Sequence, residues 1–178
     1  MVYPKEYINY LIEFHATRDY FECHELLEEY WKEHPNDGNE AFWVGCIQVA
    51  VGQYHERRNN LRGARLMYES AIEKFTMLPQ VVKGIDVHNI TVQLQQHVQA
   101  CQLQLPYNDM KFIIVDPQLG ELCEQEVALR NLRWDISSKE VSEEIIHRHK
   151  LRDRSDVIAA RQEALRKKSI ERDFTKEE

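Results

Sequence analysis

The sequence predicts an all-α protein, built as a single-domain helical bundle with a C-terminal helical extension. Only six glycines and five prolines punctuate the 178 residues, whereas β-sandwiches and α/β folds need many more turns. Apolar residues recur at spacings of three and four along several segments, which is the period of a helix. The segment from Ala41 to Tyr54 has no charged residue, which is typical of a helix at the centre of a bundle.

Four helices are predicted in the first 78 residues, over 4–16, 20–34, 39–57 and 60–78. Pro4 suits the first position of a helix, and Asp19 can cap the start of the second helix. The third follows the turn sequence His34–Gly38, because proline and Asp-Gly are residues that turns require. An asparagine, Asn59 or Asn60, can cap the fourth.

The central part of the chain predicts two more helices with an extended segment between them. Asp86 precedes an apolar stripe at helical spacing that ends near Leu105. Residues 111–115 could form a strand, but we expect an extended linker over the bundle because no second strand is evident. Asp116 and Pro117 then have the cap and first-position chemistry of another helix.

The C-terminal third is a different kind of sequence. Ser137–Glu140 predicts a capping box that opens a helix to about residue 152, and Ser155 can open a last helix to about residue 172. The last 49 residues are weakly basic, whereas the net negative charge lies in the first 129. We expect residues 1–110 to form the bundle core, and residues 111–178 to form a linker plus a C-terminal helical hairpin. The hairpin is expected to pack on the core or on a partner, through which the protein would self-associate or bind another protein.

Charge and apolar content also predict the cellular compartment of the protein and the classes of partner it does not bind. The formal net charge of -7 disfavours general nucleic-acid binding, which depends on neutralising phosphates. No apolar run is long enough to span a bilayer, and the N-terminus lacks the apolar core of a signal peptide. The four cysteines form no C-x-x-C pair, which favours reduced core residues. We expect a cytoplasmic protein with no membrane partner.

One pair of helix faces combines polar and apolar residues. On the second predicted helix, helical spacing aligns Phe21, His24, Glu28 and Trp31, while Glu22, Glu25 and Glu29 point away. On the third, the same spacing aligns Val44, Gln48, Val51 and His55. If the two faces meet, a polar cluster forms from His24, Glu28, Gln48 and His55. A buried charge requires a partner or a metal.

Three interpretations of this cluster remain open: a metal site, a metal-free ligand-binding or catalytic site, and a structural network. His24, Glu28 and His55 form a ligand set suited to a divalent metal, Zn or non-haem Fe, which could activate water for hydrolysis. His24–Glu28 resembles the H-E-x-x-H metalloprotease pattern, although Glu28 replaces its second histidine and Glu25 lies on the wrong face. Alternatively, His24 pairs with Glu28 while Gln48 pairs with His55, and this buried network fixes the register of two helices. The other histidines are expected at the surface: His15, His34, His88, His97, His147 and His149.

A candidate anion site follows directly after the third predicted helix. Arginines and a helix start lie together there, and the residues proposed to bind are Arg58, Asn60, Arg62 and Gly63. Guanidinium groups and free backbone N–H groups at a helix N-terminus can hold a carboxylate or a phosphate. The alternative is ordinary helix capping, with the arginines paired to nearby glutamates.

Three segments of the sequence together resemble those of a known family. Phe21-Glu-Cys-His-Glu-Leu-Leu-Glu-Glu-Tyr-Trp31, Gly45-Cys-Ile-Gln-Val-Ala-Val-Gly-Gln-Tyr-His55 and Asn60-Leu-Arg-Gly-Ala64 resemble domain-of-unknown-function family 309, whose pattern includes F-x-x-H-E-x-x-E-x-x-W. The resemblance covers residues 5–78 and implies an all-helical fold. It marks as family positions His24, Glu28, Trp31, Gln48, His55, Asn60 and Gly63. It implies no activity.

The function expected from the sequence is that of a cytosolic helical binding or interaction module with a buried His/Glu/Gln cluster. The alternative is a metal-dependent hydrolase that uses His24, Glu28 and His55. The sequence assigns no catalytic residue, and it names neither a substrate nor a partner.

Overall fold

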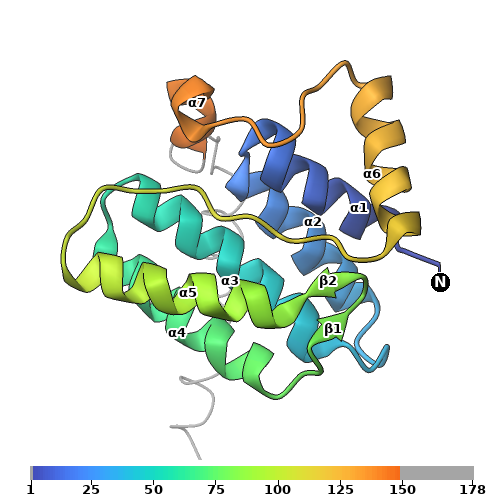
Figure 1. Cartoon of the computed structure of the whole chain (residues 1–178), viewed down its shortest axis with the longest axis horizontal. Coiled ribbons are helices and arrows are strands. Elements are labelled where there is room, and N and C mark those ends of the chain that lie inside the picture. Colours follow the sequence, from blue (N-terminus) through green and yellow to red (C-terminus); the bar gives the residue numbers. More distant parts are fainter. Residues whose placement is uncertain (1, 149–178) are drawn as a thin grey trace, which may run out of the picture. The chain divides into compact units, whose positions relative to one another are not determined.

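The computed structural model describes residues 2–148, and those up to Ile146 belong to one compact unit. The all-α prediction is confirmed, with a two-stranded sheet as the small β element of the described residues (Figure 1). No described helix is both long enough and apolar enough to cross a bilayer. The helix predicted over 155–172 lies outside the described residues.

The helices keep the predicted order. They are α1 (Lys5–Ile12), α2 (Tyr20–Glu33), α3 (Glu40–Arg57), α4 (Leu61–Thr76), α5 (Val87–Gln102), α6 (Pro117–Leu129) and α7 (Glu143–Ile146). A π-helical turn, η1 (Glu13–Thr17), extends α1, and a 3-10 turn, η2 (Ser138–Glu140), precedes α7. The predicted caps are confirmed at Asp19, Asn60 and Asp116, each of which accepts a backbone N–H. Asp86 caps α5 in the same way.

The uncharged segment forms the central helix, as predicted. The α3 helix packs against both α2 and α4, and α4 packs in turn against α5. Two glycines let α4 approach, because a Cβ at Gly45 would collide with the ring of Phe75, and one at Gly52 with the ring of Tyr68. Close packing of this kind leaves no room for small-to-large changes.

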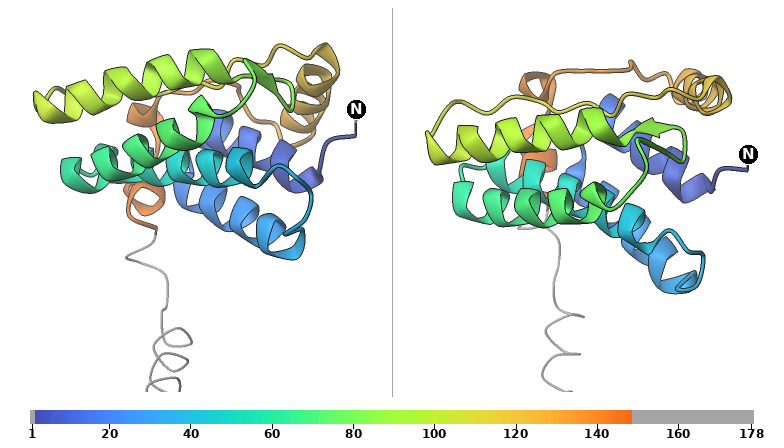
Figure 2. Two further views of the ribbon diagram at one scale, coloured as in Figure 1. Left: turned by 90° about the horizontal axis from the view of Figure 1, so that it is seen from below. Right: turned by 60° about the horizontal axis from the view of Figure 1, so that its bottom comes forward.

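The expectation that residues 111–115 have no strand to pair with is wrong. Strands β1 (Val81–Val82) and β2 (Ile85–Asp86) form a hairpin that sequence analysis missed, and Ile114 bridges Ile85 in antiparallel fashion. The hairpin turns through Lys83 and Gly84, both at positive φ (49° and 78°), which is the conformation of a tight two-residue turn. Figures 1 and 2 show the segment between α5 and α6 running back along α5 before it reaches this hairpin.

The predicted helix over 137–152 is not continuous. Ser137 and Glu140 do form the predicted capping box, but it opens only the short turn η2. Val141 then adopts an extended backbone (φ -91°, ψ 140°) before α7 begins. A capping box satisfies the N–H groups of a first turn, and it does not by itself supply the packing that extends a helix.

Candidate functional site

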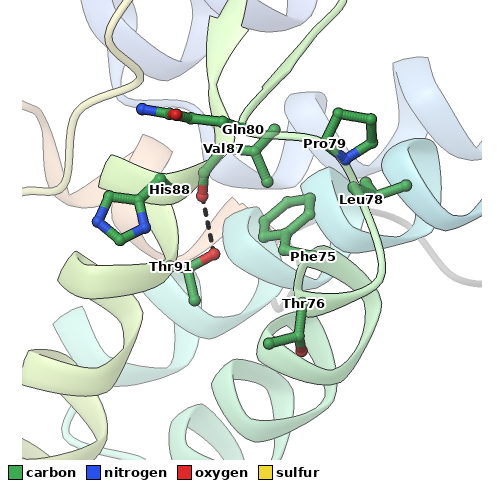
Figure 3. A pocket seen from close by; sticks show the side chains of 8 residues that line it. All are labelled: Phe75, Thr76, Leu78, Pro79, Gln80, Val87, His88 and Thr91. Atoms are coloured by element: carbon green, nitrogen blue, oxygen red, sulfur yellow. Dashed lines mark hydrogen bonds between the residues drawn. The ribbon is translucent and has the colours of Figure 1, made fainter.

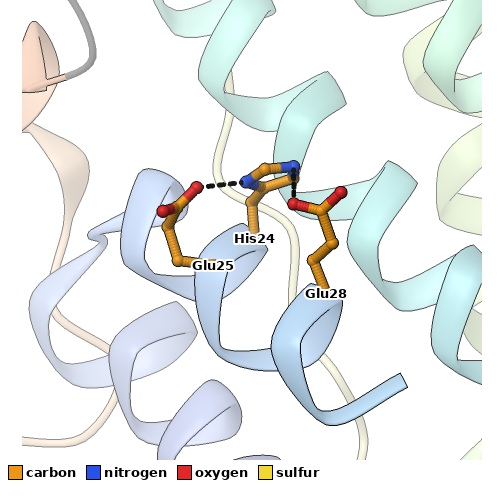
Figure 4. Close-up of side chains that lie close together, drawn as sticks. All are labelled: His24, Glu25 and Glu28. Carbon is orange, nitrogen blue, oxygen red and sulfur yellow. Dashed lines mark hydrogen bonds and ion pairs between the residues drawn. The ribbon is translucent and has the colours of Figure 1, made fainter. Parts of the chain in front are cut away.

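Three ionisable side chains meet on α2. His24 Nδ1 lies 3.0 Å from Glu25 Oε1, and His24 Nε2 lies 3.4 Å from Glu28 Oε2 (Figure 4). Glu25 was predicted to point away, so its contact with His24 corrects that prediction. The His24 and Glu28 side chains are 29% and 34% exposed, so the pair is not a fully buried one.

The other predicted members of the cluster have partners elsewhere. Gln48 Nε2 donates to Ser70 Oγ on α4 at 2.8 Å, and His55 Nδ1 lies 3.0 Å from Asn60 Nδ2. Trp31 is half-buried against the core. Within the described residues, the potential metal ligands that lie within 4.8 Å of one another are those of the α2 cluster: His24, Glu25 and Glu28. The structure therefore puts Glu25, and not His55, beside the predicted pair.

The residues of the predicted anion site contribute to the start of α4. Asn60 Oδ1 accepts the backbone N–H of Gly63 at 3.2 Å, which uses one of the N–H groups that an anion would bind. A Cβ at Gly63 would collide with the Asn60 amide, so this glycine makes room for the cap. The guanidinium of Arg58 lies over the ring of Tyr54, 4.7 Å from its centre, and Arg62 is exposed. The anion site stays a prediction.

The structure has a buried polar cluster, but it differs from the predicted one in its residues and lies between α3, α4 and α5. Glu56 on α3, which is 3% exposed, accepts hydrogen bonds from Tyr68 of α4 at 2.6 Å and from His97 of α5 at 2.7 Å. Gln53 donates to the Tyr68 hydroxyl at 2.7 Å and accepts from the backbone N–H of Met110 at 3.1 Å. Burial, together with the Glu56 carboxylate, raises the pKa of Tyr68 well above its usual value. This network ties three helices and the segment after α5 together.

A second buried polar group surrounds His15. Its Nδ1 donates to Asp135 at 2.6 Å, and its Nε2 accepts the backbone N–H of Phe112 at 3.2 Å. Burial lowers the pKa of His15, although Asp135 opposes this shift. Arg18, 1% exposed, donates to the carbonyls of Met110 and Ile136. The group therefore fixes residues 110–112 against η1.

The prediction that His15 and His97 lie at the surface is wrong, and the sequence carried a signal for His97. Ile90, Leu94, His97 and Cys101 share one helical stripe on α5, and all four are buried. His15 follows Leu11 by one turn in the same way. Treating these two histidines as solvated residues overlooked their apolar neighbours.

A cavity of about 720 Å³ lies beside the extended segment. It is lined by residues 111–115, by the first half of α6 and by His15, Trp134 and Asp135. We call it the strand-edge groove. Trp134 stacks on His15, with 4.4 Å between the ring centres, so the His15 group also holds this wall of the groove in place.

Residues 111–115 present an open strand edge to the strand-edge groove. Asp86 N donates to Ile113 O at 3.0 Å and Val115 N to Gly84 O at 2.8 Å, so Ile114 and Ile85 form the non-hydrogen-bonded pair of the bridge. The N–H and C=O of Ile114 therefore point away from β2, toward the side where Phe112 N meets His15. Within residues 2–148, neither group has a hydrogen-bond partner.

A second cavity of about 340 Å³ lies between the end of α4 and the start of α5 (Figure 3). Its lining consists of four apolar residues, Phe75, Leu78, Pro79 and Val87, and four polar residues, Thr76, Gln80, His88 and Thr91. The Thr91 hydroxyl donates to Val87 O within α5 at 2.7 Å.

Comparisons with known proteins show which family this chain belongs to. The family model described as Domain of unknown function (DUF309) matches residues 7–67. The Uncharacterized protein YpuF of Bacillus subtilis (strain 168) is 41% identical over 175 residues, which cover 97% of this chain and 100% of that protein. The chain belongs to the DUF309 family, as the resemblance implied.

Proposed function

We propose that the protein is a cytoplasmic helical binding module that holds an extended, basic segment of a partner polypeptide in the strand-edge groove. The observation that carries this proposal is the main chain of Ile114, whose N–H and C=O face the groove instead of β2. A polypeptide that adds a strand to an open sheet edge gains affinity from such groups and specificity from the side-chain pockets beside them.

The shape of the groove supports an extended occupant. Residues 111–115 alternate in burial: Phe112 is buried, whereas Ile113 and Val115 are 42% and 45% exposed. An added strand could pair with these β-branched side chains across the sheet. Opposite them, a Cβ at Gly120 would meet no atom within 4 Å, so the wall formed by α6 leaves open space.

The charge of the groove supports a basic occupant. Glu121 and Glu124 on α6 are exposed, and Asp116 stands at the start of the same helix. Lys111 is the cation of the lining, and its ammonium lies 2.6 Å from an oxygen of Asp135. The acidic side is therefore in excess, which favours lysine or arginine in the partner.

A peptide library tests this proposal. A phage-displayed library of random decapeptides is panned on the immobilised protein, and selected peptides are then titrated by calorimetry. We expect the selected peptides to be rich in Lys, Arg and β-branched residues, and their affinity to fall with rising salt. Binding should also weaken in Glu121→Gln/Glu124→Gln.

Two pairs of variants test whether the peptide binds in the strand-edge groove. Gly120→Trp fills the open space and should abolish binding, whereas Gly120→Ala leaves the space open and should keep it. Ile114→Pro removes the N–H that faces the groove and should weaken binding about tenfold relative to Ile114→Ala, which loses only the side chain. Failure to select peptides, or equal affinities in Gly120→Trp and Gly120→Ala, would refute the proposal.

A further inference from the structure

Three side chains of the α2 cluster, His24, Glu25 and Glu28, each offer an atom that can bind a metal ion, and these atoms lie within 4.8 Å of one another. Glu25 Oε1 lies 3.0 Å from His24 Nδ1, so Nε2 is the ring nitrogen that faces Glu28. His24 Nε2 lies 3.4 Å from Glu28 Oε2. A histidine nitrogen and a carboxylate oxygen are both common zinc ligands.

The separation fits a particular kind of cation. Zinc binds histidine nitrogen and carboxylate oxygen at about 2.0–2.1 Å, so two ligands at a tetrahedral angle lie about 3.4 Å apart. His24 Nε2 and Glu28 Oε2 have this separation. We propose that His24 and Glu28 bind a divalent transition-metal ion of the zinc type on α2, with water completing its coordination.

The neighbours of the two ligands orient them for this role. Metal-bound histidines usually donate their other ring N–H to a carboxylate, which fixes the ring and strengthens the ligand. Glu25 occupies that position at Nδ1. Lys32 Nζ lies 2.9 Å from Glu28 Oε1, so it holds one carboxylate oxygen and leaves Oε2 toward the ring. The spacing of four residues keeps both ligands on one face of a regular helix.

This site differs from the set predicted from the sequence, because Glu25 takes an orienting role and His55 is not a ligand. It is also independent of the strand-edge groove, since none of its residues lines that cavity. Exposure of about a third for each ligand leaves room for the water molecules that complete the coordination.

Zinc titration of the full, tag-free protein after removal of metals with a chelator tests the proposal. We expect calorimetry to give one ion per chain with a Kd tighter than about 0.1 mM. His24→Ala and Glu28→Gln should abolish this binding, and Glu25→Gln should weaken it about tenfold. Two matched controls, Glu29→Gln on the same helix and His34→Ala directly after it, should bind as the unaltered protein does.

The same titration can overturn the assignment. Binding no tighter than about 1 mM, or binding unchanged by Glu28→Gln, would show that the pair is not a metal site. A loss in His55→Ala as large as that in Glu28→Gln would replace the ligand pair with the set predicted from the sequence. Circular dichroism of each variant checks that α2 remains folded, so a loss of binding is read on a native chain.

Discussion

The two polar regions of the bundle differ in how their polar groups are satisfied. Between α3, α4 and α5, the carboxylate of Glu56 meets Tyr68 and His97, and Gln53 uses both ends of its amide. Beside the strand-edge groove, the N–H and C=O of Ile114 meet no protein partner within the described residues. Burial with complete pairing stabilises a fold, whereas unpaired polar groups beside a cavity are available to a ligand.

The largest effect on stability is expected when the carboxylate at the centre of the buried network is removed. Glu56→Ala leaves two buried donors, on Tyr68 and His97, without an acceptor. We expect the free energy of unfolding to fall by about 3 kcal/mol, as measured by urea denaturation. Glu29→Ala, an exposed control on α2, should change it by less than about 0.5 kcal/mol. Equal losses in the two variants would contradict a structural role for the network.

Peptide binding in the strand-edge groove should depend on the main chain of Ile114 and not on Glu56. Ile114→Pro should cost about tenfold in peptide affinity relative to Ile114→Ala, about 1.4 kcal/mol, while Glu56→Ala should leave the affinity of the remaining folded protein unchanged. Calorimetry with one selected peptide measures both. A peptide that loses affinity in Glu56→Ala but not in Ile114→Pro would reverse the roles assigned to the two regions.

The His15 group connects the two regions, and it should make stability depend on pH. Burial lowers the pKa of His15, and Arg18, Lys111 and Asp135 are the charged groups that face it. The unfolded chain therefore binds the proton more readily, so stability falls as pH drops below about 6.5. Urea denaturation at pH 5 and pH 7.5 measures this loss, which should be smaller in His15→Asn. An unchanged loss in that variant would assign the effect to another group.

The smallest expected effect concerns phosphate binding at the start of α4. If Arg62 helps the N-terminus of α4 to hold an anion, Arg62→Ala should raise the Kd for inorganic phosphate about two- to fivefold without changing stability. Phosphate titration followed by NMR measures it, and Arg65→Ala serves as the control because Arg65 pairs with Glu69. Identical affinities in the two variants would leave Asn60 and Gly63 with capping alone.

Much of the fold was predictable because local chemistry specifies it. Asp19, Asn60, Asp86 and Asp116 cap helices as their residue types predict, and the uncharged segment became the central α3. The hairpin was missed because each strand has only two residues, too few for a periodic signal. The helix after Ser137 was overestimated because a cap does not report how much packing follows it.

The candidate sites were harder to predict, because contacts between distant segments decide them. Helical spacing placed His24 and Glu28 on one face. Gln48, however, donates a hydrogen bond to Ser70 on α4, and His55 lies beside Asn60. The buried network needed His97, 41 residues from Glu56. The open edge at Ile114 depends on its register against β2, which periodicity does not reveal.

Amide hydrogen exchange shows whether the main chain of Ile114 forms an open strand edge that binds a peptide, with the neighbouring Val115 as an internal control. In the free protein, the Ile114 N–H should exchange quickly because it has no protein partner, whereas the Val115 N–H is protected by Gly84 O. Adding a selected basic peptide should slow exchange at Ile114 and leave Val115 as it was. Protection of the Ile114 N–H in the free protein, or fast exchange with the peptide bound, would contradict peptide binding at this edge.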